Sequence, residues 1–406
     1  MKISSFSIQE KLILFILVFV QFAHIVDFML PMPLGPQLGR AFNLSAAEFG
    51  ILVSSYTLSS SMAGIAFALF VDQFNRKQVL IFFLSGFIFS TFCCGLSESY
   101  SALLISRCLA GVFGGGLNAV AFVVIGDLFA PEKRGAATGM LMSSFSIASV
   151  IGVPFSLWIS NFGGWHVPFL MLASFAVIVW PLVVFKFPSM SGHLSDGKQK
   201  RKITPAWGIF ARVLNSLPQR LGILFMMLMM FGHFMIIPYL SQSLVANTGL
   251  AESQLPLVYL VGGVLSFFTS PMIGRWADRS GKVRIFTVIH LMALVWILII
   301  TNLPILPVYL TLGISGIFFI LVTGRFVPAM AVINGLVEAK HRASYFSLLA
   351  SCHQLAGSLA TFISGHIVYF HLENKRLENY GIAGMISCLF GLMALHIMHK
   401  VATAQK

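Results

Sequence analysis

Long apolar runs recur along the chain at nearly regular intervals, separated by charged residues, Gly or Pro. A helix that crosses a bilayer needs about 20 mainly apolar residues. The first run, which contains Asp27, is long and lacks a small-x-small cleavage site, so it is interpreted as a retained helix and not a signal peptide. The pattern predicts twelve membrane-spanning helices, at residues 11–33, 47–70, 78–97, 101–125, 136–160, 165–186, 221–244, 255–273, 284–303, 307–333, 344–370 and 380–398.

One segment, residues 188–219, departs from this pattern because it is polar and basic. It predicts a cytoplasmic linker between an N-terminal six-helix half, residues 1–187, and a C-terminal six-helix half, residues 220–406. The expected fold class is an all-α polytopic membrane protein whose twelve helices form two pseudo-symmetric halves.

An internal repeat supports the two halves. Asp72, after the second predicted helix, and Asp278, after the eighth, are 206 residues apart. Arg134, after the fourth helix, and Arg342, after the tenth, are 208 residues apart. Two landmarks with nearly the same offset indicate duplicated halves, an arrangement in which transporters place the main cavity between the repeats.

Composition agrees with a membrane protein, since 57% of the residues are hydrophobic and only 10% are charged. A soluble domain carries about 25% charged residues. The formal net charge of +13 suggests binding to nucleic acid at first. However, 21 of the 26 Lys and Arg residues fall on the side of the membrane that holds the N-terminus, and three fall on the opposite side. This bias is the positive-inside signature, so it predicts that both termini are cytoplasmic and explains the basic charge without nucleic acid.

Asp27 is the one acidic residue well inside a predicted span. A charge at this depth costs at least about 2.5–3.5 kcal/mol, so the carboxyl group should pair with a cation or bind a proton. Arg107 lies at a matching depth, roughly 9 Å below the outer surface at 1.5 Å per residue, and is the natural partner. His24 is on the same helical face as Asp27 and is a candidate proton relay or a packing residue. These three residues are the candidates for proton coupling; a static ion pair, or snorkelling of Arg107, is the alternative.

Four polar residues in the second half are candidates for substrate binding. Arg325 has no acidic neighbour in sequence and is predicted to bind an anionic group of the substrate or backbone carbonyls near Pro328. His233, His353 and Gln354 lie inside predicted spans, where each is either a substrate contact or a structural side chain. The histidines show no spacing typical of zinc, so no metal site is expected.

The loops after the second and eighth helices resemble the G-x-x-x-D-R-x-G-R/K motif of the major facilitator superfamily. The second-half copy keeps the whole pattern, at Gly274, Asp278, Arg279, Gly281 and Lys282. The first-half copy keeps Asp72, Arg76 and Lys77. The resemblance implies a conformational latch between the halves; loop charge that only sets topology is the alternative reading.

A finer resemblance is to the drug:proton antiporter-1 branch, which includes sugar and drug efflux permeases. Arg107 and Gly111 match the R-x-x-x-G pattern of its fourth helix, and Gly152 and Pro154 resemble the motif of its fifth, although Ser156 stands where a further Gly is usual. The resemblance implies a monomer in the bacterial inner membrane that exports a small molecule in exchange for protons, without a cofactor. It also implies that helices one, four, seven and ten line the cavity, which brings Asp27 and Arg107 together.

The sequence contains no Walker motif, dinucleotide fingerprint or catalytic triad pattern, which argues against an enzyme and against ATP-driven transport. The expected function is therefore secondary active transport by alternating access. A facilitator or proton symporter that imports a metabolite or siderophore is the alternative. A non-transporting membrane sensor is a further alternative, but it would be expected to carry a sizeable soluble domain.

Overall fold

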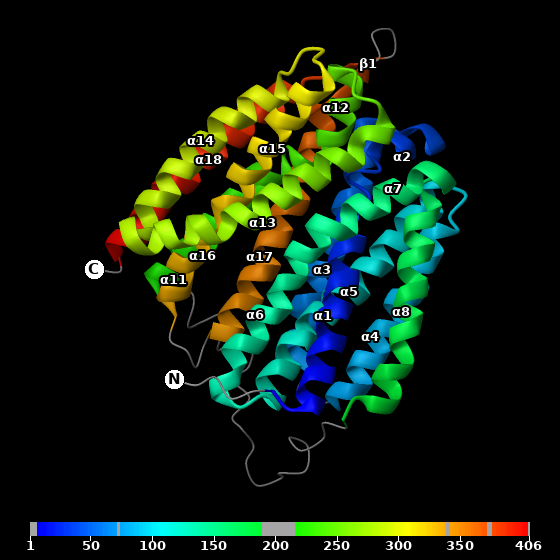
Figure 1. Cartoon of the computed structure of the whole chain (residues 1–406), viewed down its shortest axis with the longest axis vertical. Helices are drawn as coiled ribbons and strands as arrows, with labels where there is room; N and C mark the ends of the chain where they lie inside the picture. Colours follow the sequence, from blue (N-terminus) through cyan, green and yellow to red (C-terminus); the bar gives the residue numbers. More distant parts are fainter. Residues whose placement is uncertain (1–5, 71–73, 189–215, 338–341, 372–375, 405–406) are drawn as a thin grey trace.

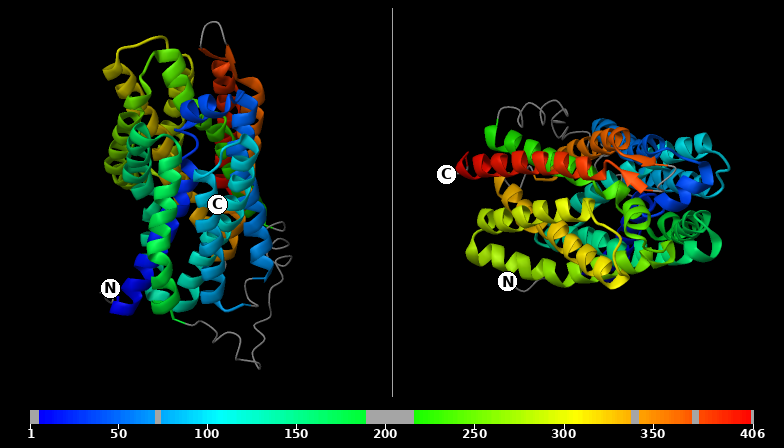
Figure 2. Two further views of the ribbon diagram at one scale, coloured as in Figure 1. Left: turned by 90° about the vertical axis from the view of Figure 1, so that its right-hand side faces the viewer. Right: turned by 90° about the horizontal axis from the view of Figure 1, so that it is seen from above.

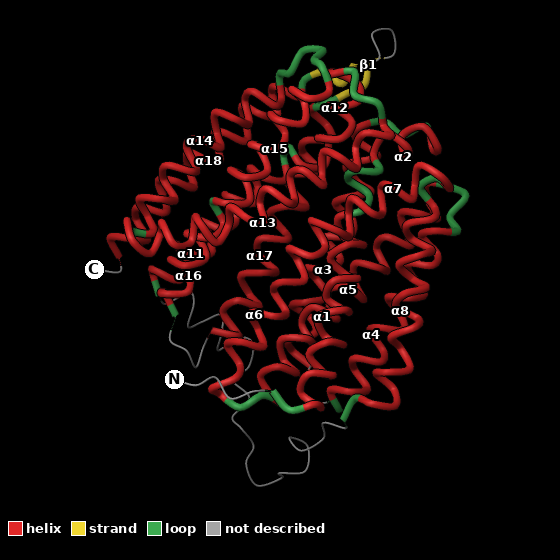
Figure 3. The backbone as a smooth tube through the Cα atoms, viewed as in Figure 1, coloured by secondary structure: helices red, strands yellow, loops and turns green. Residues whose placement is uncertain are grey.

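The computed structural model describes residues 6–70, 74–188, 216–337, 342–371 and 376–404, and nearly all of this backbone is helical (Figure 3). The helices are α1 (Ile8–Met29), α2 (Gly35–Phe42), α3 (Ala46–Phe70), α4 (Arg76–Gly95), α5 (Tyr100–Leu128), α6 (Pro131–Ile147), α7 (Val153–Gly163), α8 (His166–Lys186), α11 (Leu217–Phe234), α12 (Leu240–Thr248), α13 (Leu255–Ser280), α14 (Lys282–Thr301), α15 (Val308–Gly324), α16 (Phe326–Ile333), α17 (Arg342–Ile367) and α18 (Tyr380–Ala404), and the strands are β1 (Tyr369–His371) and β2 (Arg376–Glu378).

Within the described residues, eleven helical segments are long and apolar enough to cross a membrane. The remaining predicted span corresponds to α17, a helix of 26 residues. Its sequence is more polar than that of the other spans, with His353 and Gln354 among several serines. The structure thus agrees with about twelve spans.

Three predicted spans are interrupted and do not continue as single helices. A five-residue π turn, Ala148–Gly152, separates α6 from α7; a short 3₁₀ turn, Ile237–Tyr239, separates α11 from α12; and Arg325 separates α15 from α16. A proline lies within three residues of each break, at positions 154, 238 and 328. Proline lacks an N–H group and so removes one bond from the helical ladder, which weakens the helix there.

Two elements lie where the sequence pattern predicted something else. The connection between the first two spans contains α2, which begins with Gly35 and Pro36 and ends at Asn43 in the left-handed conformation. The predicted helix 344–370 extends too far, because α17 ends at Ile367 and Tyr369–His371 pair with Arg376–Glu378 in an antiparallel hairpin. Both elements lie at the end of the molecule that also carries α12, called the upper end below (Figure 1).

The repeat inferred from the loops is also present in the backbone. Asn43 ends α2 and Gly249 ends α12, and both have positive φ values, 50° and 77°. These two helix ends are 206 residues apart, the same offset as Asp72 and Asp278. Equivalent positions of the two halves near the upper end can therefore be found by adding 206.

The two halves lie side by side (Figure 1 and Figure 2). Helix α3 packs along α17, and α7 and the π turn pack on α13. Of the three buried apolar clusters among the described residues, one contains side chains of both halves, among them Leu34, Phe49, Tyr239 and Val368. The other two clusters contain residues of one half each and include the lower ends of α1 and α18. The buried apolar core is therefore shared by both halves toward the upper end, and toward the lower end each half has a core of its own.

Candidate functional site

Asp27 and Arg107 form an ion pair inside the N-terminal half. The Arg107 Nη1 atom lies 2.9 Å from Asp27 Oδ2 and 3.1 Å from the backbone oxygen of Asp27. The Asp27 and Arg107 side chains are 0% and 1% exposed. Because α1 and α5 bring the two residues to the same depth, the contact predicted from the sequence is present.

Two side chains that face this pair extend it into a network. The Tyr56 ring of α3 lies under the Arg107 guanidinium, whose carbon is 4.3 Å from the ring centre. The Tyr56 hydroxyl is 2.7 Å from His24 Nδ1. His24 therefore contacts the pair through Tyr56, a residue that the sequence analysis did not single out.

Glycines of α5 make the space for this network. A Cβ atom at Gly114 would lie 2.4 Å from the Tyr56 hydroxyl and 2.6 Å from His24 Nδ1, and one at Gly111 would lie 2.4 Å from the Tyr56 backbone oxygen. Such distances are too short for any side chain. The closely spaced glycines after Arg107 thus bring α5 within reach of α3, which explains a feature of the sequence in physical terms.

Part of the network remains unsatisfied. Among the described residues, Asp27 Oδ1 and Arg107 Nε are buried and have no hydrogen-bond partner. A carboxyl group that uses one oxygen for a cation and keeps the other unbonded is able to accept a proton at the second oxygen. The chemistry available here is therefore reversible protonation next to a fixed positive charge.

Gly152 and Pro154 lie next to this site. Gly152 ends the π turn, and a Cβ atom there would lie 2.5 Å from Val26 Cγ2, one residue before Asp27. Pro154 is in the first turn of α7. The helix-five motif therefore places an irregular turn directly against the part of α1 that carries the carboxylate.

Arg325 is a further buried cation, and it lies inside the C-terminal half with 2% exposure. Its Nη1 atom is 3.3 Å from His290 Nδ1 on α14, and His290 Nε2 is 2.9 Å from the Gly391 oxygen on α18. The sequence analysis missed His290, although a histidine in the middle of the apolar span 284–303 carries the same signal as His233.

The other substrate candidates lie on two helices. The His233 ring of α11 packs edge-on against Phe326, the residue after Arg325, with ring centres 5.8 Å apart. His353 and Gln354 are partly exposed on α17, the helix that contacts α3 of the other half. The structure thus groups His233 with Arg325 and places the other two on a helix that contacts the opposite half.

A sequence model of the Major Facilitator Superfamily matches residues 17–361 and 222–401. The chain belongs to this superfamily. It is 27% identical over 349 residues to YceJ of Bacillus subtilis (strain 168), an uncharacterized MFS-type transporter, and the match covers 84% of this chain and 87% of that protein. Over 120 residues it is 34% identical to Multidrug resistance protein 3 of the same organism, which covers 29% of this chain and 23% of that protein.

Solved structures of the superfamily confirm the predicted fold class. A bacterial homolog of the human lysosomal transporter Spinster, in an inward-facing and unoccupied conformation, aligns with a TM-score of 0.78 at 16% identity over 98% of both chains. The D-xylose-proton symporter aligns with a TM-score of 0.75 at 14% identity, over 95% of this chain and 97% of that one. Since it belongs to the superfamily, the chain is a secondary membrane transporter and not an enzyme.

The first-half copy of the superfamily loop motif lies partly outside the described residues, because Asp72 is not among them. Arg76 is 3% exposed, and its Nε atom is 3.1 Å from Asp127 Oδ2 at the end of α5. Lys77 is partly exposed in the first turn of α4. The described contact of Arg76 thus joins two helices of the same half, α4 and α5.

The second-half copy of the motif lies at the end of α13 and the start of α14. Gly274 is partly buried, while Asp278, Arg279 and Lys282 are exposed. Gly281 connects the helices with a φ of 95°, a conformation that residues with a side chain rarely adopt. Gly281 is therefore needed for the turn, and Asp278 and Lys282 of the motif line a shallow pocket beside it.

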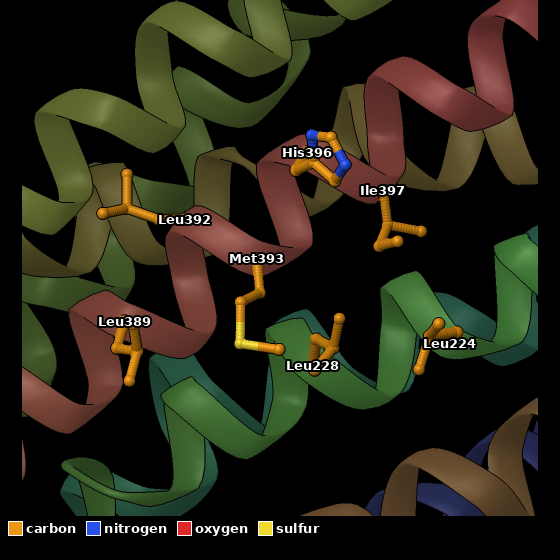
Figure 4. A pocket seen from close by; sticks show the side chains of 7 residues that line it. All are labelled: Leu224, Leu228, Leu389, Leu392, Met393, His396 and Ile397. Atoms are coloured by element: carbon orange, nitrogen blue, oxygen red, sulfur yellow. The ribbon is translucent and has the colours of Figure 1, made fainter.

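A second pocket, between α11 and α18, is almost entirely apolar (Figure 4). Its lining residues are Leu224, Leu228, Leu389, Leu392, Met393, His396 and Ile397. A solute site normally includes several polar groups that fix orientation. The networks around Arg107 and Arg325 meet that requirement better than this groove.

Proposed function

We propose that the protein is a proton-coupled exporter of a small molecule, of the drug:proton antiporter-1 type, that works by alternating access in the bacterial inner membrane. The observation that carries the proposal is the buried Asp27–Arg107 pair with its unbonded Asp27 Oδ1 atom. The protein functions as a monomer, with protons and the solute as its ligands.

The positive-inside distribution of Lys and Arg orients the molecule. In this orientation both termini are cytoplasmic and the upper end, with α2 and α12, faces outward. The Arg40–Glu252 ion pair joins the halves at this outer end. At the lower end the Lys133–Glu10 pair joins α6 and α1 of one half. Together with the divided core, these contacts support an inward-facing state.

The proton cycle follows from the geometry of the pair. When Asp27 is ionised it holds Arg107 through Oδ2, and when it binds a proton the attraction between them weakens. Tyr56 then holds the guanidinium from below and keeps it in the site. The exporter takes up a proton at Asp27 from outside and releases it to the cytoplasm, and the solute moves outward between the halves.

Helix α3 connects the proton site to the contact between the halves. Two residues before Tyr56, the Ser54 backbone oxygen accepts a bond of 3.0 Å from the Ser358 hydroxyl of α17. Further along, the Ser61 hydroxyl donates to the Ser351 oxygen at 2.8 Å. A shift of Tyr56 with Arg107 would therefore move a helix whose other face is bonded to the opposite half.

Two observations favour export over import. Gly152 and Pro154 resemble the helix-five motif of the antiporter branch, and Gly152 lies against Val26, the residue before Asp27. A relative with 34% identity over 120 residues is named for multidrug resistance. The proposed substrate contacts are His233, Arg325, His353 and Gln354. The proposed latch between the halves is formed by the loop motifs at Asp72 and Asp278.

Inside-out vesicles from cells that overproduce the protein test the proposal. Respiration acidifies the vesicle lumen, and a solute that is exported in exchange for protons collapses the gradient when it is added outside. A panel of small molecules should contain at least one that collapses the gradient with the wild-type protein and not with Asp27→Asn. Uptake of that solute without proton movement would show a facilitator, and accumulation in right-side-out vesicles driven by an inward proton gradient would show an importing symporter.

A further inference from the structure

The guanidinium of Arg325 has an open edge inside the C-terminal half. Its Nη1 atom faces His290 Nδ1 at 3.3 Å, whereas Nε and Nη2 are buried and have no hydrogen-bond partner among the described residues. The N–H groups of Nε and Nη2 are parallel and form the fork that binds both oxygens of a carboxylate. The unbonded atoms are therefore the pair that recognises a planar oxyanion.

His290 holds the other side of the guanidinium and fixes which edge stays open. Its Nε2 atom lies 2.9 Å from the Gly391 backbone oxygen, which can only accept, so Nε2 carries the proton and donates it. Nδ1 then has a lone pair and accepts from Arg325 Nη1. A neutral histidine in this tautomer orients Arg325 but supplies no negative charge.

The described acidic residues of the C-terminal half lie elsewhere. Glu252 pairs with Arg40 at the outer end, Asp278 is exposed at the lower end of α13, and Glu378 is in the hairpin. A buried charge without a partner is strongly unfavourable in a low-dielectric interior. The charge of Arg325 thus calls for an anion that these three residues do not supply.

The repeat shows why the two halves differ. In the N-terminal half, the carboxylate that satisfies the buried arginine comes from Asp27 on α1. The position 206 residues later on α11 is His233, whose ring packs against Phe326 next to Arg325. The C-terminal half has a histidine where the N-terminal half has its own carboxylate, which leaves its arginine open to one from outside. Arg325 itself is not the repeat equivalent of Arg107, because Gly313 stands 206 residues after Arg107.

We propose that Arg325, positioned by His290, binds the carboxylate group of the transported solute, so that the substrates are small organic acids. This inference rests on the proposed transport function and adds the class of solute. His233 is partly exposed, so the cluster extends from the buried guanidinium to an accessible side chain of α11.

Thermal unfolding of the purified full chain in detergent tests the proposal without a known substrate. Acetate and benzoate are the probes, acetamide and benzamide are their neutral counterparts, and sodium chloride keeps the ionic strength constant. The carboxylates should raise the unfolding midpoint of the wild-type protein in a saturable manner, and the amides should not. No rise when a carboxylate replaces chloride would show that the site does not prefer carboxylates and would overturn the assignment.

Variants identify the residue. Arg325→Lys keeps the charge but loses the fork, and its carboxylate affinity should fall about tenfold or more. Arg325→Gln should abolish the rise, while the exposed Arg376→Gln should leave it unchanged. If Arg325→Gln does not fold, Arg325→Lys still decides the question. An unchanged rise of the unfolding midpoint with carboxylate in Arg325→Lys would refute the proposal.

Asp27→Asn separates this inference from the proposed transport function. It should retain the carboxylate response in unfolding, because Asp27 belongs to the other half, but lose the proton-coupled collapse of the gradient. A protein that binds carboxylates but never moves protons would disprove proton coupling alone. A protein that exchanges protons for neutral solutes only, with no carboxylate response, would disprove the organic acid alone.

Discussion

The guanidinium carbon of Arg107 lies 4.3 Å from the centre of the Tyr56 ring, so the cation that pairs with Asp27 rests on a side chain of α3. The same tyrosine is bonded through its hydroxyl to His24. One residue therefore contacts His24 of α1 through its hydroxyl and Arg107 of α5 through its ring. This dual contact makes the site open to dissection by substitutions that remove one part at a time.

Replacing Asp27 by Asn should abolish proton exchange while the protein still folds. The Asn carbonyl still accepts a bond from Arg107 Nη1 but cannot take up a proton. Asp27→Ala leaves the buried cation unpaired and should destabilise the protein by about 3–5 kcal/mol. The measurements are the collapse of the pH gradient in inside-out vesicles and the unfolding midpoint in detergent.

The matched control for Asp27→Asn is Glu98→Gln, since Glu98 is exposed in the connection before α5. It should change neither transport nor stability. Proton exchange at the wild-type rate in Asp27→Asn would remove Asp27 from the coupling mechanism.

Replacing Tyr56 by Phe should have a smaller effect than replacing it by Leu. Phe keeps the ring under Arg107 and loses the hydroxyl bond to His24 Nδ1. The His24 nitrogen is then buried without a partner, which should lower the free energy of unfolding by about 1–3 kcal/mol. Leu loses in addition the cation–π contact, worth about 0.5–2 kcal/mol. Unfolding midpoints and the pH profile of transport are the measurements; identical pH profiles for wild type and Phe would show that the Tyr56–His24 bond plays no part in proton transfer.

Two glycines of α5 offer a matched comparison. Gly114→Ala would place a Cβ atom 2.4 Å from the Tyr56 hydroxyl, so it should disrupt the network and reduce transport at least tenfold. Gly126→Ala on the same helix has no atom within 4 Å of the new Cβ. It should be tolerated and should stabilise the helix by roughly 0.5–1 kcal/mol. Equal behaviour of the two variants would contradict the close approach of α5 and α3.

The ion pair between Arg40 and Glu252 should respond to a charge swap. The Glu252 carboxylate raises the pKa of Arg40 through their hydrogen bonds, so Arg40 stays charged at every physiological pH. Because Arg40 is largely exposed, the pair is worth about 0.2–1 kcal/mol, which corresponds to a change of up to about fivefold between states. Arg40→Glu should slow transport within that range, and adding Glu252→Arg should restore it.

The coupling energy from the complete double-mutant cycle, measured on transport rate, decides that prediction. A value of zero would show that the pair does not contribute to closing the outer end.

The sequence predicted the spans well because length and apolarity alone decide whether a segment can cross a bilayer. It placed Asp27 and Arg107 together because both are charged at the same depth. Tyr56 and His290 could not be found this way, since a tyrosine or histidine in a span has no obligatory partner. Their roles depend on which helices pack together, which no local pattern records.

The sequence analysis predicted each of the three interrupted spans as a single helix and did not predict α2, for a related reason. A proline inside a span is compatible with an unbroken helix, as Pro271 in α13 shows, or with an interruption, as at Pro154. Neighbouring helices decide between the two outcomes. The contact of Arg76 with Asp127 was equally hidden, because the sequence pairs that arginine with its own loop and not with the end of α5.

The π turn between α6 and α7 gives the fifth span a joint. The Val153 N–H group bonds to the Ala148 oxygen five residues back, so the turn holds one residue more than an α-helical turn. Moving this surplus by one position exchanges a single hydrogen bond for its neighbour and turns the residue that it passes by about 100° around the helix axis, while the flanking helices keep their orientation. The side chains that this span presents to Val26, next to the acidic residue of α1, can thus change while α7 stays packed on α13.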